Sequence, residues 1–215
     1  MNINDLGAGD ILFFSSDSNA LHHELDIHTS IVVSGPPCIY TLDLSIRGLV
    51  YEKVNRLPLH KTATAFYLTN GHSKDPNLFN SVAQAWSRHS QGITHSRGYF
   101  SRSFVYRFIF RSSSYGEKAI RYAAHLHQHC QTAVPEDLFS AYILCAYVPV
   151  ALYQTIYGVD CHNIMALDAV NTTPHTLVQY LTSNPCWEYA TLTSSQERSR
   201  TKLGVSLRNS GLNLR

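Results

Sequence analysis

The order of the expected elements predicts an α+β fold, because strand-like segments fill the first third of the chain and helical patterns follow them. The chain has 215 residues, a length that single domains commonly reach. Hydrophobic residues make up 44% and charged residues 15%, which is enough apolar material for a substantial core. We therefore expect one domain over residues 1–192 and a flexible basic tail over residues 193–215.

Most of the expected strands lie in the first third of the chain, and each is rich in β-branched and aromatic residues. A turn leads into the first strand, and Gly35 with two prolines ends the second. The third alternates in hydrophobicity and is expected to pair with the second as a hairpin. The expected strands cover residues 9–14, 28–33, 39–44, 49–54, 63–69 and, near the end, 186–192.

Helical patterns follow, beginning with residues 76–89, where the apolar spacing puts Leu78, Val82, Ala85 and Trp86 on one face. Periodicity does not decide whether residues 104–110 form a strand or a buried helix. The remaining expected helices cover residues 115–131, a run that begins at Cys145, and residues 173–181 with Pro174 in the first turn.

Charge and composition exclude several classes of protein. A net charge of +2 gives no reason to expect nucleic-acid binding, and no apolar run approaches the roughly 18 residues of a membrane span. Five irregularly spaced cysteines without a CxxC pair suggest neither a disulfide scaffold nor a zinc ribbon. The first residues lack the features of a Sec signal, so we expect a soluble cytoplasmic protein that a dedicated export system could secrete.

Cys145 is a candidate nucleophile, because it precedes an apolar run with the pattern of a helix. The partial positive charge of a helix N-terminus favours the reactive thiolate. Pro149 supports this placement, since a proline is tolerated in the first turn but costs about 3 kcal/mol in a helix interior. The alternative is a buried core cysteine, and a histidine partner is needed to favour catalysis.

His28 could be that partner, because it opens the second expected strand. Alternation puts His28, Ser30 and Val32 on one face of this strand. On the paired strand, Asp43 could hold the second imidazole nitrogen, so Cys145, His28 and Asp43 form the predicted catalytic set. A cluster of His22, His23, Glu24 and Asp26 lacks the spacing of a known zinc motif, and we expect neither a metal nor a cofactor.

The motifs together resemble the circularly permuted NlpC/P60 group of papain-like hydrolases. The matching runs are GDILFF from Gly9, HTSIVVSG from His28, CAYVPVALY from Cys145 and TPHTL from Thr173. The resemblance implies a small antiparallel sheet or partial barrel packed on helices, with Cys145 as nucleophile and Asp43 where the group often has glutamate. It implies a peptidase or amidase acting on peptides, with peptidoglycan stem peptides as the expected substrate. The absence of a Sec signal fits a secreted effector or toxin and an unsecreted cytosolic hydrolase equally well, and a toxin that acts on its own cell's wall would require a cognate immunity protein.

The sequence departs from this group at Ala146 and Tyr147, where a small polar residue and an acid are usual, and residues 92–114 have no counterpart. The related lecithin:retinol acyltransferase-like branch has an asparagine before its cysteine, where this chain has Leu144, which favours amide hydrolysis. A thioesterase or acyltransferase and a non-catalytic binding module remain alternatives.

Cys161 is a rival nucleophile, because GVDC resembles the start of the unpermuted enzymes of the same family. Those enzymes need a histidine on a strand well downstream of the cysteine. After Cys161 only His162 and His175 remain, and neither lies in a strand-like run. We therefore interpret Cys161 as structural, together with Cys38, Cys130 and Cys186.

Overall fold

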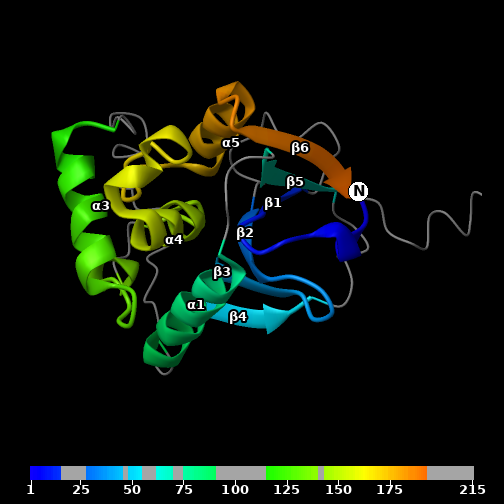
Figure 1. Cartoon of the computed structure of the whole chain (residues 1–215), viewed down its shortest axis with the longest axis horizontal. Coiled ribbons are helices and arrows are strands. Elements are labelled where there is room, and N and C mark those ends of the chain that lie inside the picture. Colours follow the sequence, from blue (N-terminus) through cyan, green and yellow to red (C-terminus); the bar gives the residue numbers. More distant parts are fainter. Residues whose placement is uncertain are drawn as a thin grey trace, which may run out of the picture.

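The computed structural model describes residues 1–15, 28–45, 48–54, 62–69, 75–90, 115–139 and 143–192. It contains a six-stranded antiparallel sheet that packs against helices, which confirms the predicted α+β class (Figure 1). The strand order is β4-β3-β2-β1-β5-β6. The strands are β1 (Ile11–Ser15), β2 (His28–Ser34), β3 (Tyr40–Ser45), β4 (Gly48–Lys53), β5 (Thr62–Leu68) and β6 (Trp187–Leu192).

The expected strands all occur, with ends that differ from the prediction by one or two residues. The predicted hairpin between the second and third strands is confirmed, since Ser30 pairs with Asp43 and Ile31 with Leu42 across β2 and β3. Neighbours that are remote in the chain complete the sheet, because β5 pairs with β1 and β6 pairs with β5. The two ends of the domain therefore meet in one sheet.

Side-chain alternation along the strands divides the core into two layers. Ile31 and Val33 of β2 belong to the main core with the helices, whereas Val32 belongs to a smaller cluster with Leu6 and Leu12. Consecutive residues of a strand point to opposite faces, so the larger core marks the face that the helices cover.

The helices are α1 (Pro76–Ser90), α3 (Glu117–His129), α4 (Tyr147–Tyr157) and α5 (Pro174–Ser183), and 3-10 turns cover Ile3–Asp5 (η1), Glu136–Phe139 (η3) and Gly158–Asn163 (η4). Helix α1 contacts β2 and β4, α4 contacts β2 and β3, and α5 contacts β6. Helix α3 packs on α4 at the outside of the helical layer (Figure 1). The nucleophile candidate thus precedes the helix that lies between α3 and the sheet.

The predicted buried face of α1 needs a correction. Phe79 is completely buried, whereas Leu78 is only partly buried. The Phe79 ring contacts the rings of Tyr153 and Tyr157 at centroid distances of 5.1 and 6.2 Å, so packing against α4 rotates the buried face by one residue. Val82, Ala85 and Trp86 are buried as predicted.

Helix α4 begins at Tyr147, two residues later than predicted, because Cys145 and Ala146 form the preceding turn. This turn is closed by the Tyr147 amide, which donates to the Leu144 carbonyl at 3.0 Å. Pro149 is the third residue of the helix, which confirms its predicted place in the first turn.

Helix α5 shows a physical reason for the TPHTL run. Thr173 is its N-cap, and the Thr173 side chain accepts a hydrogen bond from the Thr176 amide at 3.0 Å. Pro174 occupies the first helical position, where a missing N–H costs nothing, and Leu177 is completely buried.

Three sequence interpretations fall outside the described residues: the cluster from His22 to Asp26, the segment over 92–114 and the tail over 193–215. Within the ranges that the structure does describe, no helix is both long and apolar enough to cross a membrane.

Candidate active site

Strands β2 and β3 bring His28 and Asp43 together. Ser30 lies directly opposite Asp43, so His28, two residues before Ser30, is a diagonal neighbour of Asp43 on the same side of the pair. The His28 Nε2 and Asp43 Oδ2 atoms are 3.3 Å apart. The hairpin therefore gives the imidazole a carboxylate partner from 15 positions further along the chain.

The imidazole is held on a second side by an aromatic ring. The rings of Phe14 and His28 stack with centroids 6.5 Å apart and planes 27° from parallel, and these two residues are register partners across β1 and β2. The His28 side chain keeps 34% exposure and the Asp43 side chain 17%. The imidazole is thus oriented on the sheet but still accessible for a proton transfer.

Cys145 meets β2 at its first two residues. Both His28 and Thr29 interact with the Cys145 sulfur. Because consecutive residues of a strand point to opposite faces, a single sulfur can contact both only at the end of the strand. Since His28 Nε2 faces Asp43, Nδ1 is the nitrogen left for the sulfur. The structure therefore brings all three residues of the predicted set into one chain of contacts.

The charges of this site favour an ion pair. Burial alone would lower the pKa of His28, but its hydrogen bonds to Asp43 and Cys145 and their negative charges raise that pKa to about 9. Burial alone would raise the pKa of Cys145, but the hydrogen bond and the charge of His28, together with hydrogen bonds from Thr29, lower it. Both shifts favour a thiolate beside an imidazolium.

The position of Cys145 before α4 acts in the same direction. The helix has 11 residues, and its N-terminal amides carry a partial positive charge that stabilises a nearby anion. As a residue Cys145 is also partly exposed, as a nucleophile that attacks an external substrate must be. The site thus combines a favoured thiolate with access.

Cys161 has the opposite environment. It is completely buried in η4, and its Sγ lies 3.7 Å from the Met165 carbonyl. Burial raises the pKa of Cys161 to about 12, against an opposing effect of Tyr115. This environment agrees with the interpretation of Cys161 as structural.

Cys130 is also buried, and that burial, together with the acidic Asp137 and Glu136, raises its pKa. The Cys130 backbone carbonyl accepts a hydrogen bond from Trp86 Nε1 at 2.7 Å, which joins α1 to the end of α3. Cys38 and Cys186 are partly exposed free cysteines.

The two departures from the family pattern after Cys145 are core residues. Ala146 and Tyr147 are completely buried, and the Tyr147 hydroxyl lies 2.7 Å from the Tyr122 hydroxyl of α3. Tyr147 thus joins α4 to α3. An acid in its place would be buried against a helix instead of facing solvent, which explains in terms of packing why tyrosine occurs there.

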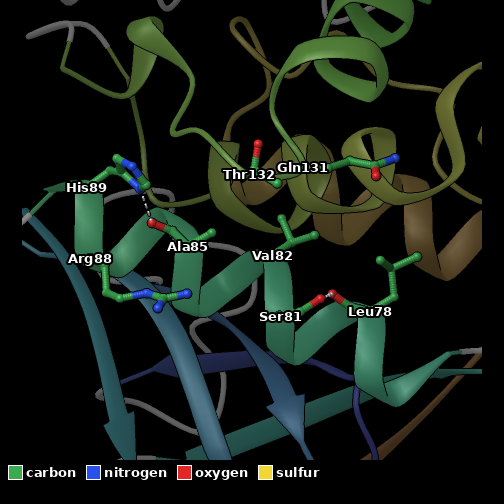
Figure 2. Close-up of a pocket in the computed structure, with 8 residues that line it drawn as sticks. All are labelled: Leu78, Ser81, Val82, Ala85, Arg88, His89, Gln131 and Thr132. Carbon is green, nitrogen blue, oxygen red and sulfur yellow. Dashed lines mark hydrogen bonds between the residues drawn. The ribbon is translucent and has the colours of Figure 1, made fainter.

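A surface hollow of about 490 Å³ lies apart from this set of residues. Figure 2 shows its lining side chains on α1 and on the segment after α3. Among them, His89 donates from Nδ1 to the Ala85 carbonyl at 2.8 Å, so it is engaged within its own helix. Its lining residues are Leu78, Ser81, Val82, Ala85, Arg88, His89, Gln131 and Thr132, none of which belongs to the Cys145 set.

The described ranges contain no group of three or more His, Cys, Asp or Glu side chains arranged to hold a metal ion. No protein-family model matches the sequence, and comparisons with curated proteins and with solved structures found no match.

The sequence analysis missed one residue of the site. Thr29 is completely buried and interacts with Cys145 through its side chain and its backbone. Alternation gave no reason to select Thr29, since it predicts that neighbours in a strand point away from each other. Only the meeting of α4 with the end of β2 places Thr29 at the sulfur.

Proposed function

We propose that this protein is a cysteine hydrolase in which Cys145 is the nucleophile, His28 the base and Asp43 the residue that orients the imidazole. The observation that carries the proposal is the continuous contact from Asp43 through His28 to Cys145, with a 3.3 Å separation between Nε2 and Oδ2. A nucleophile, its base and an orienting third group are the parts that covalent acyl transfer requires.

The reaction begins with the proton of the Cys145 thiol on His28. The thiolate attacks the carbonyl carbon of an amide, a C–S bond forms, and the negative charge moves to the carbonyl oxygen. The backbone N–H of Cys145 contributes to the stabilisation of this oxyanion. The imidazolium of His28 then protonates the leaving nitrogen as the C–N bond breaks, which leaves a thioester on Cys145.

Hydrolysis of the thioester returns the enzyme to its first state. His28, now neutral, takes a proton from water, and the resulting hydroxide adds to the thioester carbonyl. The C–S bond breaks and a carboxylic acid leaves. The proton on His28 then either returns to the sulfur or stays on the imidazolium beside the thiolate. Asp43 stays in contact with Nε2 throughout, and this contact stabilises each imidazolium state.

The resemblance of the motifs to permuted NlpC/P60 enzymes supports a peptide amide as the substrate, in peptidoglycan stem peptides. In that assignment the fold is papain-like, with the strands of the sheet ahead of the nucleophile helix. A secreted effector or toxin of this kind needs a cognate immunity protein in the cell that makes it. The burial of Ala146 and Tyr147 supports a working site over a decayed binding module, because packing accounts for both departures.

Digestion of purified muropeptides tests the function. We expect the wild-type protein to release new fragments, identified by mass spectrometry, and Cys145→Ala to release none. The matched control is Cys161→Ala, which removes a buried cysteine outside the set and should cleave as the wild type does. Cleavage by Cys145→Ala, or loss of cleavage only in Cys161→Ala, would contradict the assigned nucleophile. If wild-type protein with a reactive Cys145 left every muropeptide intact, the peptidoglycan assignment would be wrong.

A further inference from the structure

Thr29 lies at the point where the sheet meets the nucleophile. It is the second residue of β2 and pairs with Phe13 of β1. Alternation puts Thr29 on the same side as Ile31 and Val33, which belong to the core that the helices cover. Its side chain therefore points toward the helical layer, where Cys145 precedes α4.

The Thr29 hydroxyl is unusual because it is buried without a partner. Its Oγ1 is inaccessible to solvent and has no hydrogen bond of ordinary geometry within the described residues. The neighbouring Ser30 hydroxyl, by contrast, donates to the Leu42 carbonyl at 3.4 Å. A buried hydroxyl without a hydrogen bond destabilises the folded protein, and valine would fill the same space without that cost.

Cys145 gives this hydroxyl a role in one protonation state only. The side chain and the backbone N–H of Thr29 both act on the sulfur and lower the pKa of Cys145. A neutral thiol is a weak acceptor, whereas a thiolate forms short, charge-assisted hydrogen bonds. The hydroxyl therefore lacks a good acceptor, at a cost in stability, while Cys145 is a thiol, and it gains a strong acceptor when the proton is on His28.

We propose that Thr29 is a fourth member of the catalytic set, which donates hydrogen bonds from its hydroxyl and its amide to the Cys145 thiolate. The proton that leaves the sulfur goes to His28, and Thr29 keeps its own proton. This inference rests on the proposed function, because it assumes that Cys145 is the nucleophile.

Three variants separate this role from packing. Thr29→Val removes the hydroxyl but keeps the shape and the amide, and Thr29→Ser keeps the hydroxyl. Thr155→Val is the matched control, because Thr155 of α4 is also completely buried with an unpaired Oγ1 in the described structure and is ten residues beyond Cys145. For each full-length variant, the pH profile of Cys145 alkylation by limiting iodoacetamide and the melting temperature are measured.

We expect Thr29→Val to shift the acid limb of the Cys145 profile to higher pH and to slow alkylation on that limb by about tenfold or more. Its melting temperature, measured at a pH below the acid limb where Cys145 is a thiol, should stay equal or rise. Thr29→Ser should react as the wild type does. Thr155→Val should melt at the same or a higher temperature with unchanged reactivity. Removal of an unpaired hydroxyl should thus change the reactivity of Cys145 at position 29 and not at position 155.

The proposal is overturned if Thr29→Val reacts like the wild type, or if its reactivity and its melting temperature fall together and Thr29→Ser does not restore them. A failure of the proposed function gives a different result. In that case wild-type Cys145 itself shows the pH profile of an ordinary thiol, and none of the three variants changes it.

Discussion

Asp43 acts on the sulfur through His28, and its effect is an increase in the pKa of His28. Its hydrogen bond and charge help to raise the pKa of His28 to about 9, against the effect of burial. A group with a raised pKa is protonated up to that higher value, so the imidazolium persists through neutral pH and is lost as pH rises through about 9. The carboxylate therefore helps to set the alkaline limit of the proposed reaction.

Asp43→Asn should move this alkaline limb to lower pH. The amide oxygen can still accept the hydrogen bond from Nε2, but the negative charge that favours the imidazolium is gone. The pH dependence of kcat/KM for a cleaved muropeptide, or of Cys145 alkylation, measures the shift. Glu52→Gln provides the control, because Glu52 is an exposed carboxylate on β4. An unchanged alkaline limb in Asp43→Asn would mean that the 3.3 Å contact has no electrostatic role.

The residues of the catalytic set differ in how far the sequence could predict them. His28 and Asp43 could be inferred together, because strand alternation and a hairpin put them on one side of two paired strands. The prediction of Cys145 depended on Pro149, because a proline in the first turn indicates where the helix begins. Thr29 could not be found this way, since its contact with Cys145 depends on how α4 docks at the end of β2.

At the scale of elements, a hydrogen bond joins α4 to the turn before the first strand. The Tyr153 hydroxyl of α4 donates to the Gly9 carbonyl at 2.7 Å, and both groups are in the core. Gly9 has a φ of 88°, a left-handed conformation that favours glycine in the turn before β1. The first and the third motif of the sequence thus contact each other directly.

Tyr153→Phe should reduce the free energy of unfolding by roughly 1–3 kcal/mol, because it leaves the Gly9 carbonyl without its buried donor. Urea denaturation measures the change. Tyr189→Phe is the control, since Tyr189 is 59% exposed and its variant should stay within about 0.5 kcal/mol of the wild type. Equal effects of the two variants would show that the Tyr153 bond does not stabilise the fold.

The elements themselves were largely predictable, and their exceptions have physical causes. Alternation and turn residues located the six strands to within two residues. The buried face of α1 was wrong by one position, because Phe79 packs on Tyr153 and Tyr157 of a helix far along the chain. The 3-10 turn η4 was not predicted. Its start is fixed by Gly158, whose φ of 59° and close approach to His127 of α3 are tertiary features.

For the whole molecule, the sequence predicted the class of fold but not the strand pairings that complete the sheet. Consecutive hairpins account for β1 to β4, but the pairing of β5 with β1 and of β6 with β5 joins segments that no local pattern relates. The site depends on the same kind of long-range packing, since His28 and Cys145 approach each other only when α4 docks on β2. The proposed catalytic pair therefore depends on the complete sheet and helix layers.

The pH profile of alkylation tests the pair most directly. Native protein is treated with limiting iodoacetamide over a range of pH, and the labelling of each cysteine is read by peptide mass. We expect Cys145 to react fastest, with an acid limb below that of an ordinary thiol, and buried Cys161 to react only after unfolding. In His28→Ala, only Thr29 still opposes the effect of burial on Cys145, so its pKa should rise and its rate at neutral pH should fall about tenfold or more. Slow labelling of Cys145 that His28→Ala leaves unchanged would contradict the catalytic pair.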